Sequence, residues 1–215
     1  MIQIVRLGLV AIFCVLPLGC ASLFDPGPPA ANVIMPVQLP EPAQAERLPI
    51  QLLVSRPATE AAMSTDRIMA LMNGYEVRAL DEAKWASPVP LIVQRQLVDA
   101  LESSRRLAAV GWEESSLDTK YRLSTDIRRF FLRYDSPGSN PTVDIALVFA
   151  LIDTESGKIL ARRLVRVEEQ CEGNTVRDFV TTFSLAMSKA LAQTCVWTVE
   201  QLEPHVLEVS SRKDF

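Results

Sequence analysis

Few residues of this chain have the types and the spacing that catalysis or metal binding requires. Its single histidine, His205, argues against a histidine-ligated metal site and against a Ser-His-Asp triad. Asp126, Asp144 and Asp153 lie on or beside expected strands and could pair for acid–base chemistry, but solvated charges on a sheet face are the simpler interpretation. No G-x-G or G-K-[ST] segment offers a phosphate-binding loop for ATP hydrolysis. We therefore predict no catalytic residue, no cofactor and no metal site.

The composition narrows the class of protein further. The formal net charge is -4 and the pI is near 5.2, which argues against a dedicated nucleic-acid binder. A hydrophobic content of 48% with 22% charged residues excludes a collagen-like chain, a low-complexity disordered chain and a multi-span membrane protein. We expect one core, or at most two small ones.

The N-terminus has the arrangement of a secretion signal. A short basic start, MIQIVR, is followed by the apolar run Leu7–Leu18. This run is too short to cross a hydrocarbon core of about 30 Å as a helix, which needs roughly 20 residues. Its length is typical of the apolar part of a signal peptide.

The next residues carry the one covalent modification that the sequence predicts. Residues 16–20, LPLGC, resemble a bacterial lipobox, in which a small residue precedes a cysteine that receives a diacylglyceryl group. Pro17 departs from the Leu that is usual at that place, and the alternative is an ordinary signal peptide with a coincidental cysteine. We predict that residues 1–19 are removed and that Cys20 is lipidated. Ala21, in place of Asp, implies export to the outer membrane, with the domain facing the periplasm.

Two cysteines remain in the mature chain, Cys171 and Cys195. An even pair in an oxidising compartment could form a disulfide, and closing a loop of about 25 residues would contribute roughly 3 kcal/mol. However, the helix expected between them extends about 27 Å, whereas bridged Cα atoms approach within about 7 Å. The two residues are therefore either bridged by a C-terminal tail that folds back, or two buried free thiols.

Residues 20–47 are predicted to be a lipidated, proline-rich linker. Prolines are concentrated here, at Pro26, Pro28, Pro29, Pro36, Pro40, Pro42 and the following Pro49. Such a segment favours an extended, polyproline-like conformation and would hold the folded domain off the membrane. The apolar stretch Val33–Val37 could instead dock on the domain.

The remaining chain alternates between strand and helix patterns. We expect a strand from Leu48, a hairpin in which Asn73-Gly74 joins residues 66–72 to residues 75–80, and a helix over residues 89–104. Strands are expected at residues 106–111, 120–132, 143–152 and 159–168, and an amphipathic helix at residues 175–192. The predicted domain covers residues 48–200, and residues 201–215 are expected to form a polar tail.

Three side chains are candidates for partner binding. Trp85 could be an anchor at an interface, or it could pack the start of the first helix against the sheet. Arg129 and Arg163 belong to two groups of arginines, each on one expected strand, which could form one basic patch facing acidic partner loops or lipid headgroups. The groups are Arg128, Arg129 and Arg133, and Arg162, Arg163 and Arg166. A solvated outer face with compensating carboxylates is the alternative.

The order and spacing of several segments are similar to the ABC-type transport auxiliary lipoproteins. The segments are Asp66–Ile68, Ala83–Pro88, Leu91–Gln94 with Leu97 and Leu101, Ala108–Val110, Tyr121–Leu123 and Phe179–Leu191. The resemblance covers roughly residues 48–200. It implies an α+β fold, with a mostly antiparallel sheet and two amphipathic helices packed on one face. The resemblance implies no catalytic residues for this chain.

The resemblance also implies a function. Relatives are non-enzymatic outer-membrane lipoproteins that serve transporters with MCE domains, which move phospholipids or other apolar molecules across the envelope. We expect a docking subunit whose partners are the MCE-domain protein and the ABC permease and ATPase of the same system, and the chain could also form a homo-oligomer. The alternatives are a periplasmic lipid carrier with its own apolar pocket, and an assembly or pilot lipoprotein of another envelope machine. A pocket of several hundred Å³ would favour the carrier, and a solid core would favour docking.

Overall fold

The structure is a computed structural model that describes residues 29–112, 115, 119–136 and 138–213, with side chains described as far as residue 205. Residues 31–215 form one compact unit. Its strands are β1 (Ala31–Val33), β2 (Leu48–Val54), β3 (Ala58–Thr59), β4 (Arg67–Met72), β5 (Glu76–Trp85), β6 (Leu107–Gly111), β7 (Tyr121–Tyr134), β8 (Thr142–Asp153) and β9 (Ile159–Gln170). Its helices are the 3₁₀ turn η1 (Ala61–Met63), α2 (Val89–Ser103) and α3 (Val176–Lys213).

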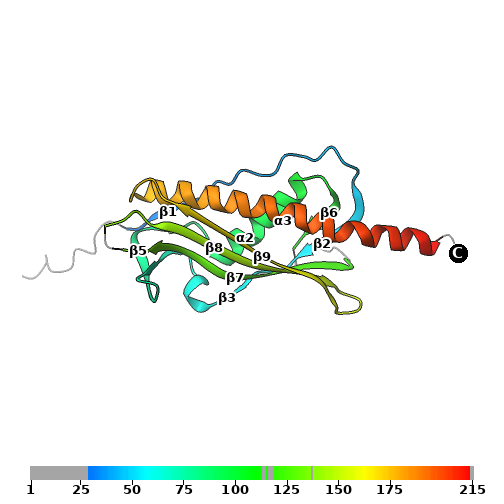
Figure 1. Ribbon diagram of the computed structural model, residues 1–215, viewed down its shortest axis with the longest axis horizontal. Coiled ribbons are helices and arrows are strands. Elements are labelled where there is room, and N and C mark those ends of the chain that lie inside the picture. Colours follow the sequence, from blue (N-terminus) through cyan, green and yellow to red (C-terminus); the bar gives the residue numbers. More distant parts are fainter. Residues whose placement is uncertain (1–28, 113–114, 116–118, 137, 214–215) are drawn as a thin grey trace, which may run out of the picture. The chain divides into compact units, whose positions relative to one another are not determined.

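The sheet is organised around the long strand β7. One edge of β7 pairs antiparallel with β8, which in turn pairs antiparallel with β9. The other edge pairs in parallel with three strands in turn, β2, β3 and β4. Beyond them, β5 forms an antiparallel hairpin with β4, β1 lies parallel to β5, and β6 lies parallel to β2. The two helices cover this sheet (Figure 1).

The fold class is therefore α+β as predicted, but the sheet is mixed and not mostly antiparallel. Among the described residues, the antiparallel pairings are those of β4 with β5, β7 with β8 and β8 with β9. The β2–β6 pair is parallel because the chain between these strands returns through α2, and a crossover of this kind brings a strand back in the same direction. A hydrophobic pattern identifies each strand but does not say which strands become neighbours.

The local turn and helix signals are confirmed. Asn73 and Gly74 join β4 to β5 with φ angles of 53° and 79°, the left-handed conformation that an Asn-Gly hairpin turn requires. Helix α2 begins at Val89, as predicted, and Pro90 stands in its first turn, where its missing N–H breaks no helical hydrogen bond.

Helix α3 is longer than predicted, since it continues to Lys213 instead of ending near Ala192. Buried residues continue at helical spacing beyond Leu191, at Cys195, Val199 and Leu202. The expected polar tail from residue 201 thus begins inside the helix, and no tail folds back along α3 within the described residues. His205, in the expected polar tail, is half-buried with its ring centroid 5.8 Å from that of Tyr121.

The end of the predicted linker lies against the domain. Met35 is 3% exposed, and its carbonyl accepts a hydrogen bond of 3.0 Å from Gln96 Nε2 of α2. Gln38 N–H donates to Ser188 Oγ of α3, and Ser103 Oγ donates to the carbonyl of Pro40. The stretch Val33–Val37 therefore docks on the domain, which was the alternative to a free linker.

Aromatic side chains fill the space between the helices and the sheet. Trp85, at the end of β5, meets Phe183 of α3 edge to face with 5.2 Å between ring centroids, and Phe183 stacks on Phe130 of β7 at 5.0 Å. Phe149 of β8 packs near Trp197 of α3. Each of these five side chains is at most 5% exposed. Their burial is the main force that holds α3 on the sheet.

Candidate functional site

An arginine cluster lies on the sheet face that points away from the helices. Asp144 of β8 is 1% exposed and accepts hydrogen bonds from three guanidinium groups. Its Oδ2 is 2.9 Å from Arg129 Nη1, 3.1 Å from Arg133 Nη1 and 3.3 Å from Arg166 Nη2. Arg133 and Arg166 also pair with Glu168.

A β-bulge in β7 produces this cluster. Ile127 pairs with Leu147, but Arg129 pairs with the next residue back along β8, Ala146, so the register shifts by one residue between them. Without the bulge, strand alternation would turn Arg129 to the same face as Ile127, which is buried under the helices. Bulges re-aim side chains in this way, and the alternation pattern of the sequence gives no sign of one here.

The cluster keeps Asp144 ionised. Burial by itself raises the pKa of the Asp144 carboxyl, but hydrogen bonds from Arg129 and Arg166 outweigh burial and lower it below its ordinary value. The other two aspartates singled out from the sequence are paired as well, Asp126 with Arg128 and Asp153 with Lys120. The described geometry thus places each of the three carboxylates beside a basic side chain.

Arg163 does not belong to the face that carries Arg129. It pairs with Phe149 in the β8–β9 register, and Phe149 points toward Trp197 of α3. Arg162, the preceding residue, pairs with Ala150 and is exposed. It lies on the open face of the sheet, which is the face that carries the arginine cluster and points away from the helices. The expected single patch of six arginines is therefore divided between two faces of the sheet, because neighbouring residues of a strand alternate.

The structure corrects the role predicted for Trp85. A side chain that is 1% exposed and enclosed by Phe130 and Phe183 offers no surface to a partner in this conformation. The ring packs α3 against the sheet, between Phe183 of α3 and Phe130 of β7. The spacing of aromatic residues could not separate these two roles.

Of the two alternatives for Cys171 and Cys195, the structure has the second, since both are buried free thiols. Cys171 precedes α3, whereas Cys195 lies within it, about 28 Å along the axis from the first helical residue. Burial raises the pKa of the Cys195 thiol to about 12, and burial also raises that of Cys171. Cys20, the predicted lipidation site, lies outside the described residues.

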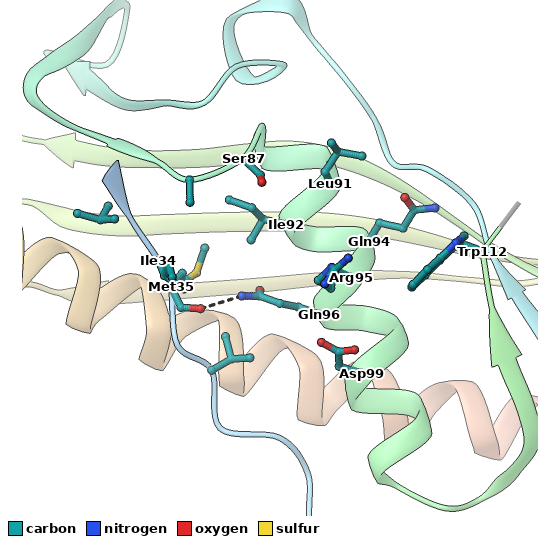
Figure 2. Close-up of a pocket in the computed structure, with 13 residues that line it drawn as sticks. Ile34, Met35, Ser87, Leu91, Ile92, Gln94, Arg95, Gln96, Asp99 and Trp112 are labelled. Carbon is teal, nitrogen blue, oxygen red and sulfur yellow. Dashed lines mark hydrogen bonds between the residues drawn. The ribbon is translucent and has the colours of Figure 1, made fainter. Parts of the chain in front are cut away.

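A half-open groove of about 730 Å³ lies over the exposed side of α2. Residues 33–37 form one wall, Trp112 stands at the opposite side, and Leu91, Arg95 and Asp99 project from the helix between them (Figure 2). Apolar and charged side chains are mixed along its lining. The sequence does not predict this groove, and the apolar stretch Val33–Val37 within a proline-rich segment is its one sign there.

Two polar groups of the groove lack a matching partner among the described residues. Gln96 is 7% exposed and its Nε2 is bonded to Met35, but its buried Oε1 has no hydrogen-bond partner in the described part of the chain. The Arg95 guanidinium lies 6.0 Å from the centre of the Trp112 ring, and neither the ion pairs nor the hydrogen bonds of the described residues give it a carboxylate partner. Buried polar atoms are rarely left unpaired, so the floor of the groove is a site worth testing.

Two further observations concern the described residues alone. They contain no group of three or more His, Cys, Asp or Glu side chains placed to hold a metal ion. None of their helices is both long and apolar enough to cross a membrane.

The fold is shared with proteins of known structure. A Xanthomonas campestris protein, 24% identical, superposes with a TM-score of 0.75 over 82% of this chain and 98% of its own. A hypothetical protein of Chlamydia trachomatis, 8% identical, gives a TM-score of 0.53 over 72% of this chain and 98% of its own.

The chain is also similar in sequence to a curated protein and to one protein family. An uncharacterized protein of Bradyrhizobium diazoefficiens is 28% identical over 185 residues, which are 84% of this chain and 48% of that protein. The chain thus spans about half the length of that relative. The model of one protein family, described as the ABC-type transport auxiliary lipoprotein component, matches residues 33–196, more than half of the chain.

Proposed function

Because the chain belongs to the ABC-type transport auxiliary lipoprotein component family, we propose that it is a non-catalytic subunit that docks or supports an MCE-type transport system. Cys20 carries the lipid that anchors it in the outer membrane, and the domain faces the periplasm. Its partners are the MCE-domain protein and the permease and ATPase of the same system. The cargo of that system is a phospholipid or another apolar molecule.

The filled interior is the observation that favours docking over carrying. The contact between helices and sheet is filled by the buried rings of five aromatic side chains, Trp85, Phe130, Phe183, Phe149 and Trp197. Carriers of apolar ligands enclose most of the ligand's surface. A domain whose interior is filled in this region contributes to transport by binding other subunits, because side chains occupy the space there in which a carrier would enclose its cargo.

The open sheet face supplies the charge for such contacts. Arg162 is exposed there and has no ion-pair partner among the described residues, and Arg128 is 61% exposed beside Asp126. Leu164, 59% exposed on the same face, adds apolar surface. Arginines with a neighbouring apolar side chain are typical of protein interfaces, and their charge accelerates association with acidic surfaces.

The groove over α2 supports the second candidate, a lipid carrier, because its volume is in the range of small-molecule sites. One purification separates the two functions. The protein is isolated from envelopes in mild detergent, and its co-purifying proteins and extracted lipids are identified by mass spectrometry. Docking predicts the MCE-domain protein in stoichiometric amount, with no lipid held by the domain after Cys20→Ser. A stoichiometric lipid on the Cys20→Ser protein, without the MCE-domain protein, would favour the carrier.

A further inference from the structure

The docked segment shortens the tether between the lipid anchor and the domain. If residues 20–47 were all free, they would span roughly 30 Å as a random coil. Because β1 begins at Ala31 and residues 31–40 are hydrogen-bonded to β5, α2 and α3, at most the 11 residues from Cys20 to Ala30 are left to separate the anchor from the domain. Such a stretch spans about 18 Å as a coil and at most about 36 Å when extended. An anchor this short restricts which side of the domain can face the membrane.

The groove lies immediately next to the point where this tether joins the domain. Val33, the last residue of β1, lines it, and the following Ile34 is 75% exposed at its edge. Leu91 of α2 is 40% exposed on the same surface, and Leu39, further along the docked segment, is 39% exposed. Large apolar side chains are therefore exposed on the side of the domain where the chain from Cys20 enters it.

The polar groups of the groove suit phospholipid headgroups. Trp112 is partly buried at the rim, and tryptophan favours the boundary between headgroups and acyl chains. Arg95 beside it can bind a phosphate, because no carboxylate among the described residues pairs with it. Asp99, one turn further along α2, would repel phosphate but can pair with the ammonium group of an ethanolamine headgroup.

We propose that the groove over α2, with Ile34, Leu91, Arg95 and Trp112, is the surface through which the anchored domain rests on a phospholipid bilayer. Since the Arg162 side of the sheet faces away from the helices, the same orientation leaves that face free for the transport partners. The inference rests on the lipid anchor of the proposed function.

Fluorescence quenching of Trp112 tests the contact. The chain has three tryptophans, and Trp85 and Trp197 are at most 5% exposed, so Trp112 is the one placed to meet lipid. The lipidated protein is reconstituted in vesicles of phosphatidylethanolamine and phosphatidylglycerol with brominated acyl chains. We expect quenching that disappears in Trp112→Phe and falls at least twofold in Leu91→Asp. Leu185→Asp is the matched control, because Leu185 is 49% exposed on α3, away from the groove, and it should quench like the wild type.

The possible outcomes are distinct. Unquenched Trp112 in the anchored wild type, or equal quenching in Leu91→Asp and wild type, would overturn the inference. Loss of MCE-domain capture in Leu91→Asp, with the fold retained, would assign the groove to a protein partner and overturn it as well. A stoichiometric lipid in the groove of the Cys20→Ser protein would assign it to a carried ligand. Quenching as expected without capture of the MCE-domain protein would leave the membrane contact standing while the docking function fails.

Discussion

At the scale of single residues, Asp144 is the clearest case of a charge held in place by the fold. A carboxylate that is 1% exposed is stable only because three guanidinium groups reach it across strands β7 and β9. Removing one charged side chain from such a group leaves the charges of the others without their counter-charge. Arg129 and Arg166 are 45% and 44% exposed, so water compensates for part of that loss.

We therefore expect Asp144→Asn to lower the free energy of unfolding by about 2 kcal/mol in urea titrations. Asp126→Asn is the control, since that carboxylate is 39% exposed and, among the described residues, forms its ion pair with Arg128 alone, and it should cost less than about 1 kcal/mol. Equal losses of unfolding free energy in the two variants would show that the arginine cluster stabilises the fold no more than the exposed Asp126–Arg128 pair does.

We also expect Asp144 to make the stability of the fold depend on pH. Because the pKa of Asp144 is lowered in the folded state from its ordinary value of 3.8, its contribution is fully present above pH 3.8 and is lost as the pH falls through the lowered value. Thermal melts from neutral pH to below pH 3.8 should show a smaller loss of stability in Asp144→Asn than in the wild type. An identical acid dependence would contradict this assignment.

The buried thiols make a separate prediction. With the pKa of Cys195 raised to about 12 and that of Cys171 also raised, neither should react with a thiol reagent at pH 8 while the protein is folded. In urea, the Cys20→Ser mature domain should release two thiols per chain without reductant. Zero thiols before reduction would show that the two cysteines are bridged.

At the scale of elements, the packing of α3 on the sheet is what buries the centre of the core. Phe183 is fully buried between Trp85 and Phe130, and the buried Trp197 and Leu202 lie about one and about three turns beyond the predicted helix end. Phe183→Ala should cost about 3–5 kcal/mol in urea unfolding. Leu185→Ala, at a position 49% exposed on the same helix, should cost less than about 1 kcal/mol. A small effect of Phe183→Ala would place that ring at the surface.

The length of α3 is tested by truncation. A chain ending at Ala192 keeps every residue of the helix predicted from sequence but loses the buried Trp197, Val199 and Leu202. We expect it to be strongly destabilised or unfolded by circular dichroism, whereas a chain ending at His205 keeps all three side chains and should melt close to the wild type. Similar melting of both truncated chains would show that the extension does not contribute to the core.

These elements also show how far the sequence predicts the fold. The β4–β5 hairpin, α2 and the strands β7 to β9 follow from turn residues and hydrophobic period, because both signals act locally. The parallel pairings, the bulge before Arg129 and the division of Arg162 and Arg163 between two faces depend on which strands become neighbours, and local patterns do not contain that information. The groove could not be predicted for the same reason, since Val33–Val37 and Trp112 meet only after the chain has folded.

At the scale of the whole molecule, the two surfaces with unpaired cations lie on different sides of the sheet. Arg95 lies over α2 in the groove, within reach of a short tether, while Arg162 lies on the open sheet face. In the proposed arrangement the first surface meets lipid and the second meets protein. An auxiliary subunit needs this separation, because a membrane contact on the docking face would compete with its partners.

The most direct test is binding of the MCE-domain protein of the same system to the immobilised Cys20→Ser domain. The wild-type surface should bind, Arg162→Glu should slow association in a manner that weakens as salt is added, and the adjacent Arg163→Glu, which faces the helices, should leave association unchanged. Circular dichroism and melting confirm that each variant is folded. Absence of binding by the wild-type domain, at concentrations where a control lipoprotein of that system binds, would contradict the docking function.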